Sequence, residues 1–293
     1  YRDSGGAPIR GYLVNPKTDI SGAEKITHSE LTGLELYRFD DKKEELNTAL
    51  TSGNDFYEFD FQIDGENYYG QKYTDSGVAN TSDGDLQLAV HEMFHVYQNN
   101  WTSVTGALQD EANYPINKDL LALQLLTSEI SKKMPNETDA DQIQKYLEMY
   151  VAIRTKEMEI DPSSQLLVKN MANSQEHTEG TAKYVEAIVS LNTISGFTID
   201  FGGQESSTIQ SNSSVREHFA FGIWYDTGAA VTYMLEKKGL DFEADAEDGM
   251  TLYDIAKSTV NLTQAQLDIK LQDAKNEFDW SAIETEAQRL VDL

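Results

Sequence analysis

Two of the chain's five histidines, His91 and His95, stand four residues apart, and a glutamate follows the first of them directly. The stretch reads "AVHEMFHVYQ", residues 89 to 98. On an α-helix, residues four apart differ by about 40° in direction around the axis, so both imidazole groups point the same way. The spacing therefore predicts that His91 and His95 share one Zn²⁺ ion.

Glu92 lies about 100° around the same helix from His91. A catalytic zinc ion takes three protein ligands and a water molecule, and it lowers the pKa of that water to about 7. A nearby carboxylate can accept the proton as a general base, and we expect Glu92 to do so. The alternative is a pair of surface or core histidines beside an incidental glutamate. The presence of Glu92 favours an enzyme, because a site that only binds metal needs only its ligands.

The third ligand must come from further along the chain, since "HEMFHVYQNNW" contains no additional histidine after His95. The best candidate segment is "EHTEGTAKYVEAI", residues 176 to 188. On a helix, Glu179, Lys183 and Glu186 share one face, while apolar residues occupy the other. The sequence leaves open whether Glu179 lines an aqueous cleft or faces bulk water.

The letters "EGTAKYVE", residues 179 to 186, resemble the E-G-x-A-x-Y-x-E helix of gluzincin metallopeptidases, in particular their aminopeptidase branch. In that family the first glutamate of the helix is the third zinc ligand. The resemblance therefore implies that Glu179 completes the site. Glu176 and His177 are alternatives that the family pattern does not select.

The stretch "IWYDTGAAVTYMLEKKG", residues 223 to 239, is similar to the family's Tyr-x-x-Gly-Ala segment. The family's tyrosine hydrogen-bonds the oxyanion formed when a peptide is attacked, and Tyr225 stands at that place. The alternative is a core helix in which the small residues 228–230 permit close packing. His218 is a second candidate donor, in the manner of thermolysin-like enzymes.

Two features differ from the aminopeptidase branch. The 83 residues from 96 to 178 separate His95 from Glu179, so we expect a helical insertion at about residues 100 to 175. The Gly-x-Met-Glu-Asn segment that holds a substrate's free amine in that branch is absent upstream of His91. Endopeptidase and exopeptidase activity therefore both remain open.

Residues 1 to 80 predict strands and turns. The stretch "EFDFQID" alternates apolar and polar residues, and Asp64-Gly65 offers a hairpin turn into "ENYYGQKY". We expect the hairpin, from Phe59 to Tyr73, to present an edge strand near the cleft. The reason is that zincins of this type hold extended peptides along a sheet edge.

The pattern becomes helical from about Asp83, with Asp83 or Asp85 as the N-terminal cap. This helix carries an apolar stripe about 140° from the histidines. The stripe consists of Leu86, Val90, Met93 and Tyr97. We expect the helix to bury the stripe and to direct the histidines and Glu92 toward a cavity.

Residues 116 to 190 predict three or four helices, interrupted near Pro135 and Pro162. Residues 196 to 214 predict a short strand followed by a polar loop. Helices resume at about residues 215 to 238. Three more are predicted to begin after the caps Thr251, Thr263 and Ser281.

The net charge of -27 and the pI near 4.4 argue against nucleic acid or anionic lipid as partners, because both would be repelled. No apolar run approaches the roughly eighteen residues needed to cross a bilayer, so we expect no membrane insertion.

The absence of cysteine excludes disulfides and thiol chemistry. The chain begins at Tyr1 without an initiator methionine, and we expect a secreted, periplasmic or cell-surface protein.

These observations predict an α+β, zincin-like fold. Its parts are a β-rich N-terminal part of the catalytic domain, residues 1 to 80, and a helical zinc-binding part, residues 81 to 293. The function they favour is a metallopeptidase with one Zn²⁺ per chain and a peptide or protein substrate. The alternatives are a zinc-dependent hydrolase of other substrates and a non-catalytic binding protein with the same fold. The oligomeric state is left open.

Overall fold

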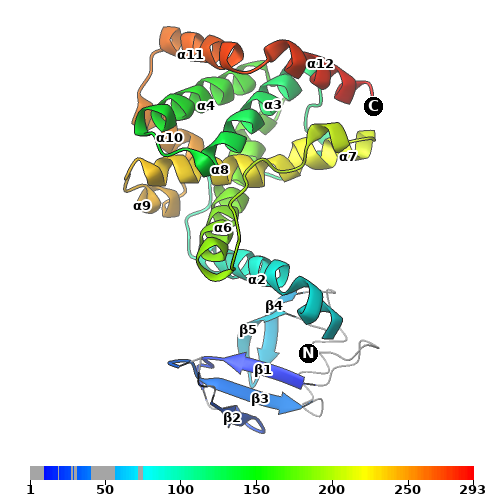
Figure 1. Ribbon diagram of the computed structural model, residues 1–293, viewed down its shortest axis with the longest axis vertical. Coiled ribbons are helices and arrows are strands. Elements are labelled where there is room, and N and C mark those ends of the chain that lie inside the picture. Colours follow the sequence, from blue (N-terminus) through cyan, green and yellow to red (C-terminus); the bar gives the residue numbers. More distant parts are fainter. Residues whose placement is uncertain (1–9, 19, 28, 30–31, 41–56, 72–74) are drawn as a thin grey trace. The chain divides into compact units, whose positions relative to one another are not determined.

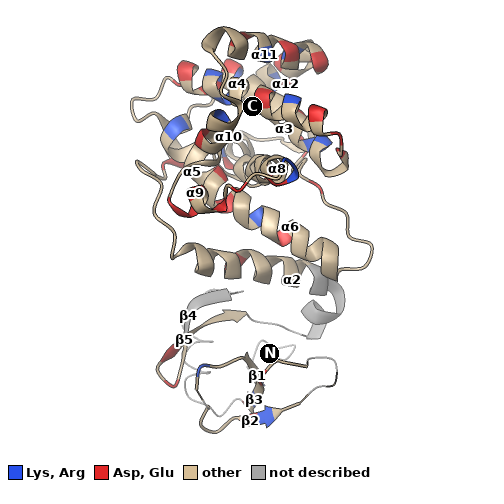
Figure 2. Ribbon diagram, turned by 90° about the vertical axis from the view of Figure 1, so that its left-hand side faces the viewer, with Lys and Arg blue, Asp and Glu red and all other residues tan. Residues whose placement is uncertain are grey.

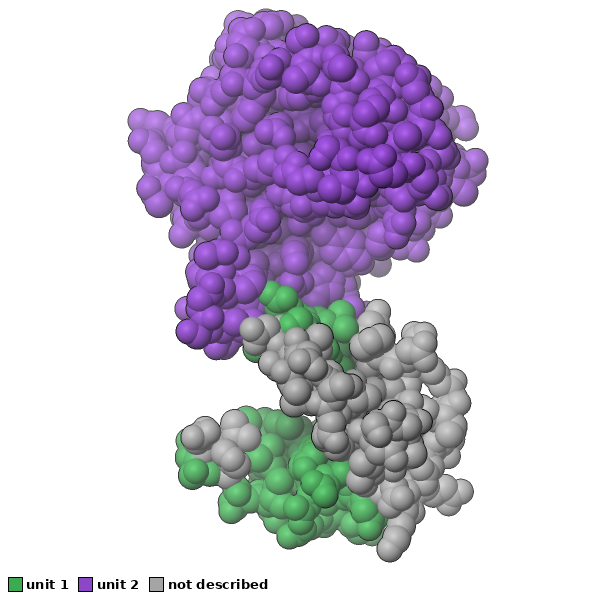
Figure 3. Space-filling view, turned by 45° about the vertical axis from the view of Figure 1, so that its right-hand side comes forward, with its two compact units in different colours: residues 1–89 green, residues 90–293 purple. Residues whose placement is uncertain are grey.

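The computed structural model describes residues 10–18, 20–27, 29, 32–40, 57–71 and 75–293. The chain divides into two compact units, residues 1–89 and residues 90–293 (Figure 3). Strands occur in the first unit, and the described part of the second unit consists of helices and loops (Figure 1). The expected α+β class, with a small β part followed by a mainly helical remainder, is confirmed.

Three strands of the first unit form an antiparallel sheet in the order β1-β3-β2. They are β1 (Arg10–Val14), β2 (Glu24–Ile26) and β3 (Leu36–Asp40). Burial alternates along β1, as it does in a strand that packs one face against a core. That core is small and consists of Leu13, Ile20, Tyr37, Phe39 and Ile63.

Strands β4 (Tyr57–Ile63) and β5 (Glu66–Gln71) form the predicted hairpin. Asp64 and Gly65 connect them with φ angles of 52° and 83°, the left-handed conformations of a tight two-residue turn. The turn prediction is confirmed, whereas Tyr73, the expected end of the hairpin, lies outside the described residues. The expected edge strand near the cleft stays a prediction.

Helix α2 (Asp75–Gln98) carries both histidines of the first motif. It begins before the predicted caps Asp83 and Asp85, so that prediction is wrong. The preceding segment contains Gly77, Asn80 and other residues of weak helix preference, so its pattern did not indicate a helix.

The predicted burial of the apolar stripe on α2 is also wrong. Met93 and Tyr97 are exposed by 59% and 49%, and Leu86 by 38%, whereas Val90 is half-buried. His91, by contrast, is buried. The reason is that the polar side chains of this helix find partners on other helices, so its polar face is the inner one.

Helices α3 (Lys118–Lys133) and α4 (Ala140–Ile160) occupy the region of the expected insertion. The side chains of Asn117 and Asp139 cap their N-termini. The interruptions predicted at Pro135 and Pro162 are confirmed, since neither proline lies inside an α-helix.

The next long helix contains two π-helical turns, in which backbone hydrogen bonds run from residue i to i+5. Its consecutive parts are η3 (Val168–Ala172), α5 (Asn173–Gln175), η4 (Glu176–Gly180) and α6 (Thr181–Thr193), of which η3 and η4 are the π-helical turns. Such wide turns occur frequently at functional sites. The second of them contains Glu179.

A third π-helical turn lies in the helix formed by α7 (Asn212–Glu217), η6 (His218–Gly222) and α8 (Ile223–Lys237). The strand expected at the start of residues 196–214 is absent; residues 196–211 are irregular apart from the short helix η5 (Ser206–Thr208), and α7 begins at Asn212. A lone strand among helices would leave its backbone N–H and C=O groups unpaired.

Four shorter helices complete the chain: α9 (Glu243–Glu247), α10 (Leu252–Val260), α11 (Gln264–Glu277) and α12 (Trp280–Val291). The predicted caps Thr251 and Thr263 are confirmed. The predicted cap Ser281 is wrong, because Asp279 accepts the backbone hydrogen bond of Ala282 and thereby caps α12.

Helix α8 runs through the middle of the helical unit and contacts α3, α4, α6 and α10 (Figure 1). Asp and Glu residues, red in Figure 2, occur on several helices of this unit, α9 and α11 among them. No helix within the described residues is both long and apolar enough to span a bilayer.

Candidate metal centre

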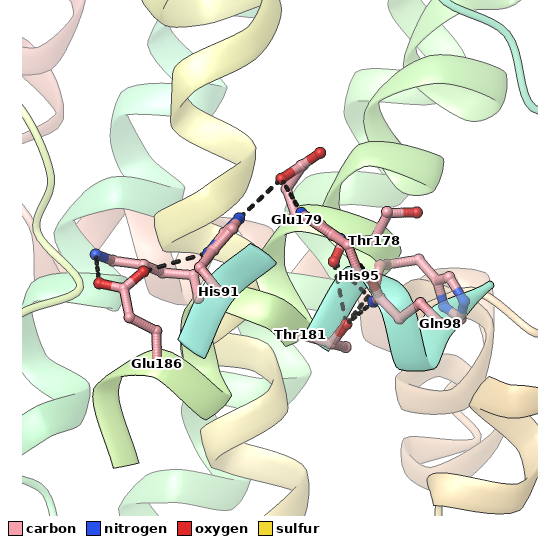
Figure 4. Close-up of polar contacts among 9 residues, drawn as sticks. His91, His95, Gln98, Thr178, Glu179, Thr181 and Glu186 are labelled. Atoms are coloured by element: carbon pink, nitrogen blue, oxygen red, sulfur yellow. Dashed lines mark hydrogen bonds and ion pairs between the residues drawn. The ribbon is translucent and has the colours of Figure 1, made fainter. Parts of the chain in front are cut away.

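Three side chains from α2 and η4 converge in the helical unit (Figure 4). Nε2 of His91 and Nε2 of His95 each lie 3.2 Å from Oε2 of Glu179. The potential ligand atoms of the three residues all lie within 4.8 Å of one another. The structure thus brings together two motifs that are far apart in the sequence.

The two nitrogen–oxygen separations in this group fit a divalent metal ion. In a tetrahedral zinc site the ligand atoms lie about 2.0 to 2.2 Å from the metal, and two of them then stand about 3.3 Å apart. Each imidazole nitrogen lies 3.2 Å from the Glu179 oxygen. Two nitrogens and one carboxylate oxygen form a donor set that zinc and other first-row metals accept.

The second nitrogen of each imidazole has its own partner. Nδ1 of His91 lies 3.2 Å from a carboxylate oxygen of Glu186, and Nδ1 of His95 lies 2.6 Å from the amide oxygen of Gln98. These oxygens are acceptors, so Nδ1 carries the hydrogen in both rings. With a metal ion in place of the hydrogen between Nε2 and Glu179, each ring would be neutral and its Nε2 would present a lone pair on the side of Glu179, as a metal ligand requires.

Both partners are themselves held in place. Lys183 donates to the other oxygen of Glu186 at 2.7 Å. The amide nitrogen of Gln98 donates to the backbone oxygen of Thr178 at 2.9 Å and to the hydroxyl of Thr181 at 2.8 Å (Figure 4). Since residues 178 and 181 flank Glu179, this amide ties α2 to the turn that carries the third candidate ligand.

The sequence did not indicate these supporting roles. Gln98 comes three residues after His95 and lies on the same face of its helix. Glu186 likewise lies on the same helix face as Glu179. Spacing alone therefore placed each of them near a candidate ligand. It did not show that their side chains reach the imidazole Nδ1 atoms.

The site stabilises positive charge. Burial by itself would raise the pKa of Glu179, but hydrogen bonds with His91, His95 and Tyr225 lower it to about 2. Burial would likewise lower the pKa of His91, but hydrogen bonds with Glu179 and Glu186 raise it to about 9. Both shifts reflect one preference, for cationic charge among these side chains, and a bound metal ion would satisfy it.

Tyr225 borders this group. Its ring stacks on that of His91, with the centroids 5.6 Å apart and the planes 12° apart. Its hydroxyl hydrogen-bonds Glu179. Glu92, the neighbour of His91 on α2, is buried, with only 7% of its surface exposed.

His218 lies in the π-helical turn η6, and its ring meets Phe219 edge-on at 4.7 Å. Burial lowers the pKa of His218 to about 4, so its imidazole is neutral at pH 7. Of the two candidate oxyanion donors, Tyr225 is the one that the structure places against the candidate metal ligands.

The two alternatives to Glu179 have other partners. The carboxylate of Glu176 is fully buried and accepts hydrogen bonds from Tyr150, Arg154 and Thr227. The ring of His177 packs against Trp101 with centroids 5.3 Å apart.

Two glycines allow the two motif helices to touch. A Cβ atom on Gly180 would lie 2.4 Å from Cα of Gly228, and one on Gly228 would lie 2.6 Å from the backbone oxygen of Glu176. Any larger residue would push the backbones apart. Gly180 follows Glu179 directly and Gly228 comes three residues after Tyr225, so the contact holds these two side chains near each other. Close packing and the placing of Tyr225 are therefore compatible accounts of the Gly-Ala segment.

No family model, no curated protein and no solved structure matches the chain.

Proposed function

We propose that this protein is a zinc metallopeptidase with a zincin-like fold of the gluzincin type, exported from the cell. The observation that carries the proposal is the convergence of His91, His95 and Glu179, with Oε2 of Glu179 at 3.2 Å from both Nε2 atoms. The hydrogen bonds from the two Nδ1 atoms to Glu186 and Gln98 also support the proposal. In metal centres, a histidine ligand typically donates its second ring N–H to such an oxygen acceptor.

The remaining residues have roles around that centre. A bound zinc ion supplies a Lewis acid that lowers the pKa of a water molecule and polarises a substrate carbonyl. Glu92 accepts the proton of the attacking water as general base. The hydroxyl of Tyr225 donates a hydrogen bond to the carbonyl oxygen as negative charge develops on it. Glu186 and Gln98 keep the two imidazoles in the required tautomer.

Elemental analysis and a peptide library test the proposal together. The purified chain is expected to hold about one zinc ion and to cleave peptides, and a chelator should abolish cleavage until zinc is restored. Glu92→Gln should retain the metal and lose nearly all turnover, because an amide cannot accept the proton. Mass spectrometry of the fragments also distinguishes internal from terminal cleavage.

Three other outcomes would change or contradict this proposal. A chain that binds zinc but cleaves no peptide is either a hydrolase of other substrates or a non-catalytic binding protein with the same fold. Near-wild-type turnover of Glu92→Gln removes Glu92 as the base. A chain that takes up no metal contradicts the proposal.

A further inference from the structure

A buried polar cluster lies behind the metal centre, around Glu176. Oε1 of Glu176 accepts hydrogen bonds from Arg154 and Thr227, both at 2.5 Å, and Oε2 accepts one from Tyr150 at 2.6 Å. The side chains of Arg154 and Glu176 are 1% and 0% exposed. A carboxylate so deeply buried is tolerated only when its oxygens are well satisfied.

The three donors belong to other helices than Glu176 itself. Tyr150 and Arg154 extend from α4, and Thr227 extends from α8. Glu176 is the first residue of the π-helical turn η4. Its carboxylate therefore fixes this one turn to two neighbouring helices.

Glu179 lies in the same turn and has different contacts. Residues three apart on an α-helix point within about 60° of each other. The wider π-helical turn increases that angle, so that Glu176 contacts the buried cluster while Glu179 contacts His91 and His95. If this turn relaxed to α-helical geometry, one of the two carboxylates would leave its partners.

We infer that Glu176 is a positioning residue: by anchoring the turn η4 to α4 and α8, it directs the carboxylate of Glu179 toward His91 and His95. This inference rests on the proposed function, since it concerns the same metal centre. The carboxylate of Glu176 bonds Tyr150, Arg154 and Thr227, so its effect on Glu179 passes through the backbone of the turn.

Two variants that each remove one hydroxyl test the inference, Thr227→Val and Tyr150→Phe. Each keeps the shape of the side chain and removes one hydrogen bond to Glu176. Zinc affinity, measured against a competing chelator, should fall about tenfold in each, by analogy with the loss of partners outside the ligand shell. Glu176→Gln is less suitable, because it weakens an ion pair of buried Arg154 and endangers the fold.

Thr127→Val is the matched control. Thr127 is also buried, on α3, and its hydroxyl donates to the backbone oxygen of Leu123 in its own helix at 3.3 Å. This variant also loses one buried hydroxyl, and it should bind zinc like the wild type. The free energy of unfolding of each metal-free variant shows which of them are folded.

The absorption spectrum of the Co²⁺-substituted protein adds a readout that stability alone does not change. Thr227→Val and Tyr150→Phe should alter the cobalt bands, because a displaced Glu179 changes the coordination, whereas Thr127→Val should not. Folded Thr227→Val and Tyr150→Phe with wild-type zinc affinity and unchanged cobalt bands overturn the inference. A wild-type chain that binds zinc without cleaving peptides contradicts the proposed peptidase and leaves the inference standing, whereas one that binds no zinc contradicts both.

Discussion

Gly180 and Gly228 bring the backbones of η4 and α8 into direct contact, since a Cβ atom on Gly180 would lie 2.4 Å from Cα of Gly228. Both glycines belong to motifs that carry a candidate functional residue, Glu179 in one and Tyr225 in the other. The contact therefore sets the distance between a candidate metal ligand and the residue proposed to stabilise the oxyanion.

Gly228→Ala is expected to destabilise the protein by about 3 kcal/mol, since the new Cβ atom meets backbone that cannot rotate away. Zinc affinity should also fall, because η4 must move. Gly222→Ala is the control on the same continuous helix: its Cβ atom would lie 3.6 Å from the nearest atom, an ordinary contact. Urea denaturation measures both variants, and equal midpoints would show that the close approach is not needed.

Glu179→Gln should weaken zinc binding by on the order of a hundredfold or more while the helical fold persists, because a charged ligand becomes a neutral amide. Glu159→Gln serves as the control, since Glu159 is exposed on α4 and pairs with Lys156. Titration with zinc in the presence of a competing chelator measures both affinities. Undiminished zinc binding by Glu179→Gln would mean that the third ligand is another residue.

Tyr225→Phe removes only a hydroxyl, so its ring can still stack on His91. Loss of one oxyanion donor typically costs about 3 kcal/mol, or about a hundredfold in kcat. We expect that loss in kcat with little change in KM and with zinc retained.

His218→Ala, measured in the same assay, separates the two candidate donors. It should affect kcat much less than Tyr225→Phe does. The opposite pattern, with a loss of about a hundredfold in His218→Ala only, would assign the oxyanion to His218 and leave Tyr225 a packing role.

Asp226 makes stability depend on pH. Burial raises its pKa from 3.8 to about 6, and the nearby charges of Asp200 and Glu186 add to the effect while Lys183 opposes it. Between these two pH values the folded protein binds a proton that the unfolded chain releases. The folded state therefore loses stability as the pH rises from about 4 to 6.

Asp226→Asn should remove this penalty. At pH 7 the variant is expected to be more stable than the wild type by about 2 kcal/mol, a value reduced for the partial exposure of the side chain. At pH 4 the difference should be small. Urea unfolding of both proteins across this range measures it, and a difference that is the same at every pH would contradict the assignment to Asp226.

The sequence predicted the elements that depend on local signals. The Asp64-Gly65 turn and the caps Thr251 and Thr263 use side chains that act within a few residues, and all three are present. The sequence analysis chose Ser281 rather than Asp279 as the N-terminal cap of α12. Both residue types are good caps, and only the structure shows that Asp279 accepts the hydrogen bond from the backbone of Ala282.

The hydrophobic pattern of α2 predicted the wrong face of this helix to be buried. Periodicity assumes that the apolar side is buried, yet Met93 is exposed by 59% and His91 by only 5%. A polar side chain is buried at acceptable cost when it is fully hydrogen-bonded, and Glu186 supplies such a partner to His91 from 95 residues along the chain. No local pattern contains that information.

The three π-helical turns, η3, η4 and η6, have a consequence for comparing this chain with others. A hydrogen bond from i to i+5 encloses one residue more than the bond from i to i+4 of an α-helix. A relative whose corresponding helices are α-helical throughout would therefore align with this chain only if a gap of one residue were opened at each wide turn. Without the gap at η4, Glu179 would be aligned with a residue next to its true counterpart in the relative.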